Sequence, residues 1–395
     1  MIVAKTSARP APFATSKLRY RIRCVVFAVS ITPTVSHAAF FFVGPGMPYT
    51  RPSEVAQIAA DGDVIEIEAG TYAGDVAVWR QNNLTIRGVG GYARLPAQGN
   101  AAEDKAIWVI KGDNTLVENI HFEGAAVEDG NGAGIRQEGT NLTVRNCRFV
   151  RNENGILSGT NPRSEIIIEN SEFDNNGAGD GYTHNLYIGE VRRFVMRFSY
   201  SHHAHVGHQI KTRAATNEIL YNRLMDENDG DASYIVDIAN GGDAHLVGNL
   251  IQQGPNAENW ALISYAAEFK PGTGELVILN NTLVNERGSG IFVVNHDAGV
   301  EALLLNNVFS GTGSVVEGRA QLHGNLVTAK QAGFRDSRGY DYRLTADSQA
   351  IGRGVDPSEV GVQRKAEFEY RHLNNMAPRT GVGPIDAGAH QFSKP

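Results

Sequence analysis

The chain has 395 residues, with 36 Lys and Arg against 43 Asp and Glu and a formal charge of −7. This acidic balance argues against a general affinity for nucleic acid, and two cysteines are too few for a disulfide-dense scaffold. A chain of this length can instead be held by a large buried core and by backbone hydrogen bonds.

Residues 1–38 have the pattern of a secretory signal. They contain six cations and no acid, then the apolar run "CVVFAVSI" and the small-residue stretch "VSHA". The apolar run is shorter than the roughly 20 residues that span a bilayer. We therefore expect cleavage near Ala38, a secreted or periplasmic product without membrane insertion, and a single domain over residues 39–395.

Removal of this segment would leave 30 basic against 43 acidic residues, a formal charge of about −13. Cys147 would then be the one remaining cysteine, so no intrachain disulfide could form. A lone cysteine in a chain rich in β-strands behaves as a small apolar side chain, and we expect Cys147 to be buried.

One phrase recurs from residue 83 to residue 327: a short alternating strand, an asparagine, and a second short strand. "NLTVRNCRFVRN" (141–152) and "ELVILNNTLVNE" (275–286) are two copies, and a further strand such as "NGILS" (154–158) precedes each copy. Such a repeat predicts an all-β parallel solenoid with three strands per coil and with asparagines stacked at one corner. The recurring asparagines are Asn119, Asn146, Asn170, Asn222, Asn249, Asn281, Asn307 and Asn325.

The strand that precedes each phrase predicts which side chains share an outer surface. Successive side chains of a strand face opposite sides. When the inward aliphatic residues of successive coils are aligned in one column, the residue that follows each of them faces outward. Coils lie roughly 4.8 Å apart, so three outward residues cover about 10 Å, the length of one or two sugar rings. The inward column is Ile135, Ile156, Leu186, Ile210 and Val236, and the outward one is Arg136, Leu157, Tyr187, Lys211 and Asp237.

These features make the chain resemble the pectate-lyase-like superfamily of right-handed parallel β-helices. The stretch "PSEVAQIAADGDVIEIEAGTYAGDVAV" is similar to the entry of exported members. The resemblance implies a capping helix over about residues 50–62 that covers the open end through Val55, Ile58 and Ala59, since an uncovered β edge invites aggregation. "YDYRLTADSQAIGRGVDP" is similar to the closing segment of bacterial members, here about residues 335–395.

The resemblance implies lyases, hydrolases and epimerases that act on polysaccharides, together with non-enzymatic members. The calcium-binding aspartates of pectate lyases and the paired aspartates of polygalacturonases have no counterpart that aligns in this sequence. The resemblance is therefore specific for the fold, and the site has to be argued from chemistry.

β-Elimination from a uronic acid needs a cation for the carboxylate, a base for the C5 proton and an acid for the leaving oxygen. The outward patch offers Arg213 and Arg136 for the carboxylate, Lys211 or His208 as base, and Tyr187 or His184 as acid. We therefore predict a polysaccharide lyase whose catalytic residues are Lys211, His208, Tyr187, His184, Arg213 and Asp237. The substrate-binding residues that we predict are Arg136, Tyr234, Asn240, Tyr265 and Glu268.

Two alternatives stay open. A glycoside hydrolase would need two carboxylates about 5 to 10 Å apart, with Asp237 and one of Glu268, Asp231 or Glu190 as candidates, and a uronate epimerase could use the same face. We rank hydrolysis second because the sequence shows no evident partner for Asp237 on that face. The other alternative, from a different class, is a non-catalytic carbohydrate-binding or surface-structural solenoid.

The run "SHHAHVGH" (201–208) suggests metal binding, because imidazoles at alternate positions share a strand face. No cysteine or carboxylate in the run completes a ligand set, so we predict no transition-metal site. We expect the acidic segment "DENDGD" (226–231) to form a turn between coils that could hold a cation. Ca²⁺ is the one cofactor that we consider. The expected partner is a polysaccharide, and we expect a monomer.

Overall fold

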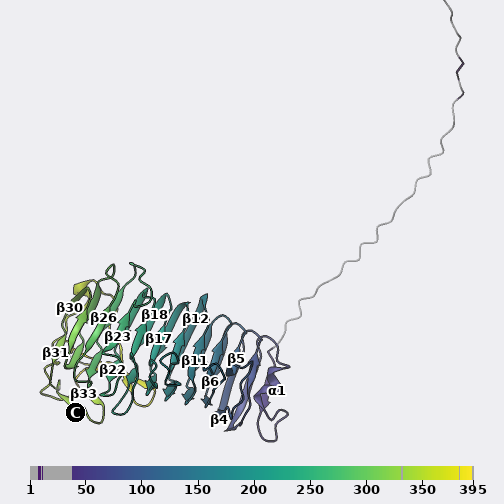
Figure 1. The fold of residues 1–395 in the computed structure, drawn as a ribbon, viewed down its shortest axis with the longest axis horizontal. Helices are drawn as coiled ribbons and strands as arrows, with labels where there is room; N and C mark the ends of the chain where they lie inside the picture. Colours follow the sequence, from purple (N-terminus) through teal and green to yellow (C-terminus); the bar gives the residue numbers. More distant parts are fainter. Residues whose placement is uncertain (1–7, 10, 12–37, 331, 382, 394–395) are drawn as a thin grey trace, which may run out of the picture. The chain divides into compact units, whose positions relative to one another are not determined.

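The computed structural model describes residues 8, 9, 11, 38–330, 332–381 and 383–393. From residue 38 onward the described residues form one compact unit, a parallel β-solenoid whose coils follow one another along its axis (Figure 1). The expected secretory signal falls almost entirely outside the described residues. Within those residues, no helix has the length and hydropathy needed to cross a membrane.

Each coil contributes one strand to each of three rows, here called A, B and C, as expected from the repeat. Row A contains β1 (Phe40–Val43), β2 (Val64–Thr71), the first half of β4 (Thr85–Pro96), β6 (Thr115–Glu118), β9 (Leu142–Arg145), β12 (Asn161–Glu169), β15 (Val191–Arg197), β18 (Thr216–Leu220), β21 (Asp243–Val247), β24 (Leu276–Leu279), β27 (Ala302–Leu305) and β30 (Ala320–His323). Row B contains the second half of β4, β7 (Ile120–Glu123), β10 (Arg148–Val150), β13 (Glu172–Asp174), β16 (Tyr200–His202), β19 (Arg223–Met225), β22 (Leu250–Gln253), β25 (Thr282–Asn285), β28 (Val308–Gly311) and β31 (Leu326–Thr328).

Row C is a separate ten-stranded parallel sheet, and it is the row that precedes each repeated phrase. It contains β3 (Ala77–Trp79), β5 (Ala106–Ile110), β8 (Ala133–Gln137), β11 (Asn154–Ser158), β14 (Leu186–Ile188), β17 (Ile210–Thr212), β20 (Val236–Ile238), β23 (Ala261–Tyr265), β26 (Ile291–Asn295) and β29 (Ser314–Glu317).

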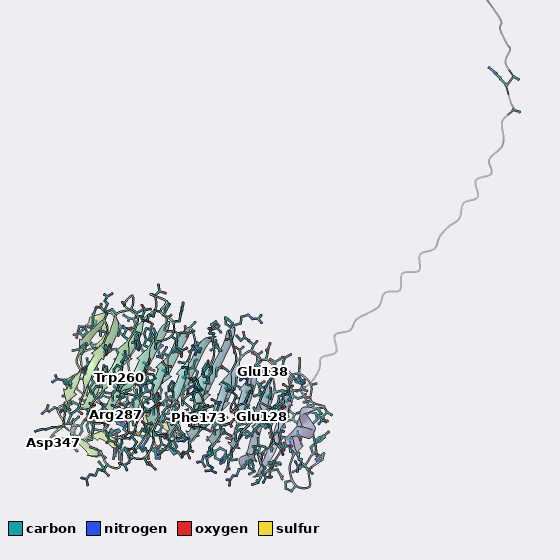
Figure 2. The ribbon with its side chains drawn as sticks, viewed as in Figure 1. Glu128, Glu138, Phe173, Trp260, Arg287 and Asp347 are labelled. Carbon is teal, nitrogen blue, oxygen red and sulfur yellow. The ribbon has the colours of Figure 1, made fainter. Side chains whose placement is uncertain are left out.

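The core fills the inside of the coils with side chains that stack from one coil to the next. Phe122, Phe149 and Phe173 stack with ring centroids 5.0 and 4.7 Å apart, and Phe173 is labelled among the side chains of the solenoid in Figure 2. The expected aliphatic column of row C is confirmed, because its register follows the alignment made from the sequence. Its members, all without exposed surface, are Ile135, Ile156, Leu186, Ile210 and Val236.

The recurring asparagines occupy two neighbouring columns at the corner between rows A and B, which corrects the single stack expected from the sequence. Asn119, Asn146 and Asn170 have φ angles of 57°, 48° and 49°. A short polar side chain tolerates this left-handed conformation better than most L-residues do, so these three asparagines make the turn itself.

The other five asparagines lie one position later and point inward. Asn249 Nδ2 donates to Asn281 Oδ1 at 2.9 Å, and Asn281 Nδ2 donates to Asn307 Oδ1 at 3.1 Å. Each of these amides also donates to a backbone carbonyl of a neighbouring coil, so the ladder pairs buried polar groups that would otherwise be costly. Cys147 takes the same position in an early coil and is fully buried, as expected.

The N-terminal cap is smaller than the helix expected over residues 50–62. The helix α1 spans only Pro52–Ala56, and in the turn that leads into β2 the Ala60 N–H donates to the Asp63 side chain. Val55 and Ala59 are buried as expected, whereas Ile58 is 53% exposed and does not cover the end.

The C-terminal segment returns along the outside of the solenoid instead of only closing its end, which corrects the role expected for residues 335–395. The Glu367 N–H donates to Tyr221 Oη at 3.1 Å, and Asn170 Nδ2 donates to the Asn374 carbonyl at 2.8 Å. Tyr221 and Asn170 belong to the middle coils, so the segment covers the corner between rows A and B there. Its elements are β32 (Phe334–Asp336), β33 (Asp341–Leu344), the 3-10 helix η1 (Pro357–Val360), β34 (Phe368–Arg371) and β35 (Asn375–Pro378).

Candidate functional site

The outer face of row C carries the expected patch in the expected register. Tyr187 on β14 is the strand partner of Lys211 on β17, and Lys211 is the partner of Asp237 on β20. Lys211 Nζ lies 3.3 Å from Asp237 Oδ2 and 2.6 Å from Glu268 Oε1. Glu268 comes from the loop after β23 and is held there by a backbone hydrogen bond to Ala239. Two carboxylates from the two following coils therefore meet at this lysine.

Arg213, just after β17, extends the cluster along the same row. Its Nε donates to Tyr187 Oη at 2.8 Å, and its Nη1 donates to Asn240 Oδ1 at 3.1 Å and pairs with Glu268 Oε2 at 2.5 Å. The guanidinium also lies 5.6 Å from the centre of the Tyr187 ring, within the range of a cation–π contact. Glu268, with its side chain 41% exposed, thus bridges the two cations of the site.

The two histidines, which the sequence predicted as base and acid of the outward patch, form the buried end of the cluster. His184 and His208 are 2% and 6% exposed, and their rings stack with centroids 4.6 Å apart. The Nδ1 of His184 accepts from the His208 N–H, and the Nδ1 of His208 accepts from the Tyr234 N–H. In the neutral form the proton of each ring therefore sits on Nε2.

Both imidazoles are neutral at neutral pH. Burial, and then the charge of Lys211, lowers the pKa of His208 to about 3. Burial, and then His208 and Lys211, holds the pKa of His184 well below its usual range. His208 Nε2 faces Asp237 Oδ2 at 3.7 Å. With its acceptor nitrogen occupied by a backbone N–H, His208 orients its neighbours and has no free lone pair for a substrate proton.

Asp237 and Glu268 experience opposite environments around the same ammonium group. Asp237 is 3% exposed, and this burial raises the pKa of its carboxyl, although Lys211 opposes the shift. Burial acts in the same direction on Glu268, but the hydrogen bonds from Lys211 and Arg213 outweigh it and lower the Glu268 pKa. Because both carboxylates contact Lys211 Nζ, at 3.3 and 2.6 Å, their nearest oxygens lie at most about 6 Å apart.

Two of the expected substrate-binding residues lie elsewhere. Tyr265 is fully buried, and its hydroxyl donates to the Gly242 carbonyl at 2.6 Å, so the prediction that it binds a substrate is wrong. Arg136 is outward but is separated from Tyr187 by Leu157 on the intervening coil, and it faces Glu138. By contrast, Tyr234 lies with its ring centroid 5.3 Å from that of His208 and belongs to the cluster.

A ladder of buried amide side chains lies beneath the patch and was not predicted from the sequence. Asn185 Nδ2 donates to Gln209 Oε1 at 2.6 Å, and Gln209 Nε2 donates to Asp226 Oδ1 at 3.0 Å. Burial raises the pKa of Asp226 to about 7. Asn185 and Gln209 each follow a site histidine directly, so the ladder fixes where His184 and His208 enter row C. The sequence signal for this ladder was the polar residue that directly precedes the inward aliphatic residue in β14 and in β17.

Comparison with known proteins agrees with this architecture. The family model described as "Right handed beta helix region" matches residues 77–189. Among solved structures, the crystal structure of pectate lyase Pel9A aligns with a TM-score of 0.63 at 14% identity, covering 91% of this chain and 98% of that one. The fold is that of a pectate-lyase-like right-handed β-helix.

Other structural comparisons are weaker. Pectin methylesterase from Aspergillus niger aligns at 11% identity with a TM-score of 0.33, over 82% of this chain and 94% of that one. The Escherichia coli protein ybhc aligns at 11% identity with a TM-score of 0.30, over 75% and 87% of the two chains. Scores this low carry no argument, and no curated protein matches the sequence.

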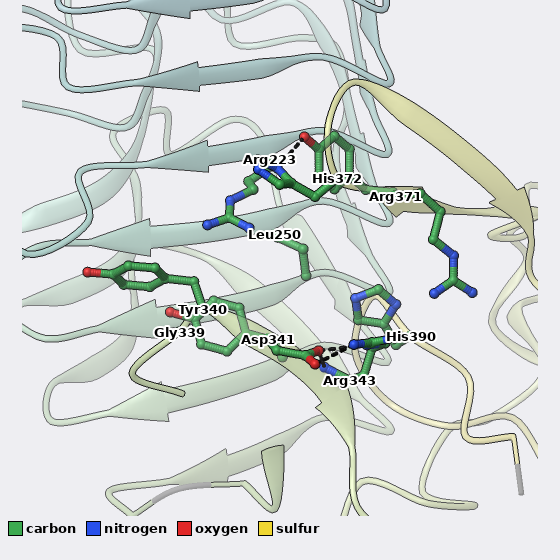
Figure 3. Close-up of a pocket in the computed structure, with 11 residues that line it drawn as sticks. Arg223, Leu250, Gly339, Tyr340, Asp341, Arg343, Arg371, His372 and His390 are labelled. Atoms are coloured by element: carbon green, nitrogen blue, oxygen red, sulfur yellow. Dashed lines mark hydrogen bonds and ion pairs between the residues drawn. The ribbon is translucent and has the colours of Figure 1, made fainter. Parts of the chain in front are cut away.

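The pectate-lyase-like β-helix also has a cavity of about 300 Å³ between row B and the C-terminal segment (Figure 3). Its arginines already have carboxylate partners: Arg343 pairs with Asp341, and Arg223 pairs with Glu227. None of the site residues expected from the sequence lines it. We interpret this cavity as a seam where the returning segment packs on the coils. Its lining residues are Arg223, Leu250, Gly339, Tyr340, Asp341, Tyr342, Arg343, Tyr370, Arg371, His372 and His390.

The buried His208 of this pectate-lyase-like β-helix predicts a pH dependence of stability. Above pH 6.5 His208 is neutral in both the folded and the unfolded protein. Between pH 6.5 and about 3 it is protonated in the unfolded chain and neutral in the folded protein. Stability therefore falls as the pH falls through that window, by about 2 kcal/mol at pH 5 from this residue.

The replacement His208→Gln should remove this part of the pH dependence, because an amide can still accept the Tyr234 N–H. The measurement is urea unfolding at pH 7 and pH 5. The matched control is His205→Gln in the same segment, where the side chain is 56% exposed. Equal pH dependence in wild type and His208→Gln would contradict the prediction.

Proposed function

We propose that the protein cleaves a uronic-acid-containing polysaccharide by β-elimination on the outer face of row C, around Lys211. The observation that carries the proposal is the joined set of Lys211, Arg213 and Tyr187, in which a bridging carboxylate holds the two cations together. The fold shared with a pectate lyase supports a saccharide as the substrate. Export to the periplasm or the medium is part of the proposal.

Glu268 marks where the substrate carboxylate binds. Its two oxygens contact Lys211 and Arg213, which is the contact that a uronate carboxylate would make with the same cations. The Glu268 side chain is 41% exposed and stands on a loop, so an incoming uronate can replace it without opening the core. Arg213 then neutralises the uronate and stabilises the negative charge that develops on it during proton removal.

Lys211 and Tyr187 supply the proton transfers. Lys211 acts in its neutral amine form, after its ammonium proton has passed to solvent: it takes the proton from C5, the C5 electron pair forms the double bond to C4, and the bond between C4 and the glycosidic oxygen breaks. The Tyr187 oxygen accepts from Arg213 Nε, so its own proton is free to pass to the departing oxygen. His208 and His184 orient this set and transfer no proton.

The test is incubation of the purified protein with polygalacturonate, alginate and an uncharged glucan. A lyase produces the ultraviolet absorbance of an unsaturated uronate from at least one acidic polymer and none from the glucan. New reducing ends without that absorbance would reject elimination. Binding without either product would indicate the non-catalytic role.

A glycoside hydrolase is the second candidate, favoured by the pairing of Asp237 with Glu268. The nearest oxygens of the two carboxylates lie at most about 6 Å apart, a range that includes the spacing of retaining glycosidases, and their pKa values are shifted in opposite directions. Asp237, with its raised pKa, would be the acid and Glu268 the ionised partner. Asp237 is 4% exposed and sits behind Lys211, which makes this arrangement the weaker of the two.

A further inference from the structure

A second cluster of ionisable side chains lies on the outer face of row B, away from the proposed lyase residues. Asp174 on β13 is the strand partner of His202 on β16, and His203 follows directly. One ligand atom from each of the three residues lies within 4.8 Å of the other two. No carboxylate within the run 201–208 itself completes a metal site. The coil before supplies that carboxylate.

The ring nitrogens of the two histidines face each other. His202 Nδ1 lies 2.6 Å from His203 Nδ1 and 3.4 Å from Asp174 Oδ1. The far nitrogens face carboxylates: His203 Nε2 lies 3.1 Å from Asp229 Oδ1, and His202 Nε2 lies 3.5 Å from Glu172 Oε1. The Asp229 carboxylate favours a proton on His203 Nε2, which leaves the His203 Nδ1 lone pair directed at His202 Nδ1. When His202 carries its proton on Nε2, toward Glu172, both Nδ1 lone pairs point at one another.

Two nitrogen lone pairs at this distance repel each other unless a cation lies between them. A carboxylate on the far nitrogen is also the arrangement that accompanies metal-bound histidines, because it fixes the tautomer and raises the basicity of the ligand. We propose that Asp174, His202 and His203 bind a divalent transition metal of the zinc class through Oδ1 and the two Nδ1 atoms. Tetrahedral ligands around Zn²⁺ stand about 3.3 Å apart, so a small rotation of His203 suffices.

The ion would join two successive coils beside the returning C-terminal segment. The His202 ring stacks on Tyr200 with centroids 3.9 Å apart, and Tyr200 in turn contacts the His372 ring, at 5.3 Å. A ligand that binds only the folded protein stabilises it by mass action. Bound metal is therefore expected to raise the thermal unfolding temperature without entering the chemistry around Lys211.

The experiment uses untagged protein that has been stripped with a chelator and then titrated with Zn²⁺ by equilibrium dialysis and with Co²⁺ by visible absorbance. We expect about one equivalent of Zn²⁺, a tetrahedral Co²⁺ spectrum and a higher unfolding temperature. Asp174→Asn and His203→Ala should weaken binding at least tenfold, and Asp229→Asn about tenfold. His205→Ala, in the same run and paired with Asp231, is the control and should bind as the wild type does.

No saturable Zn²⁺ binding by the wild type, or equal binding by wild type and Asp174→Asn, would overturn the proposal. In the first case the two imidazoles share a proton instead of a metal, and in the second the metal is held without Asp174. Asp174→Asn is nearly isosteric and on the surface, so a folded variant is available even if His203→Ala is unstable.

Discussion

Asn281→Ala is expected to lower the free energy of unfolding by about 3 kcal/mol, because it leaves several buried polar groups unpaired. Asn281 Nδ2 donates to the Leu246 carbonyl at 2.8 Å and to Asn307 Oδ1, and its Oδ1 accepts from both nitrogens of Asn249. Alanine restores none of these bonds, and the site is closed to water, since Asn281 is 0% exposed. The measurement is equilibrium urea unfolding at pH 7.

Asn146→Gly is the matched control for that prediction. Asn146 is exposed, with a φ of 48°, and its amide bonds only Asn119 and Tyr92 at the surface. Glycine adopts this backbone conformation readily, so the loss should be under about 1 kcal/mol. Similar losses in the two variants would contradict the division of the asparagines into two columns.

The register of row C could be predicted from the sequence because a strand has a side-chain period of two. Once Ile210 and Val236 are aligned as inward residues, Lys211 and Asp237 must point outward together, and they do. The same rule could have placed Tyr265. It stands two residues after Ile263, the partner of Val236, so it must point inward.

The asparagines show where periodicity fails. At the corner between rows A and B, two adjacent positions both accept asparagine, one because of its left-handed backbone and the other because of its inward hydrogen bonds. Phe198 and Tyr221 also have positive φ angles at that corner, so the turn position has no fixed residue type. The alternation of inward and outward side chains stops at the corner, so it does not distinguish the turn position from the inward position that follows it.

Contacts between loops and neighbouring coils were the other part that the sequence could not predict. Glu268 reaches Lys211 from a position 57 residues further along the chain, and Asp174 lies beside His202 only because one coil stacks on the next. A strand register specifies which residues are neighbours along a row. It does not specify how a loop folds back, so the bridging carboxylate and the third metal ligand became visible only in three dimensions.

Lys211→Arg is expected to lower kcat on the acidic polysaccharide by roughly 10² to 10⁴ while leaving KM and stability nearly unchanged. A guanidinium keeps the positive charge that Asp237 and Glu268 require, but it cannot give up its proton to act as a base. The measurement is steady-state kinetics by ultraviolet absorbance, with urea unfolding of the same variant. Lys111→Arg is the control, since Lys111 lies in an early coil and pairs with Glu103.

The charge-preserving replacement separates the two proposed reactions in a way that Lys211→Ala cannot. Alanine would leave Asp237 buried without its cation, so a loss of activity could follow from a loss of structure. If the reaction is hydrolysis, Lys211→Arg keeps most of its turnover, and Asp237→Asn abolishes it because the acid is gone. If the reaction is elimination, Lys211→Arg is nearly inactive, and Asp237→Asn retains measurable turnover because Asp237 only holds Lys211 in place.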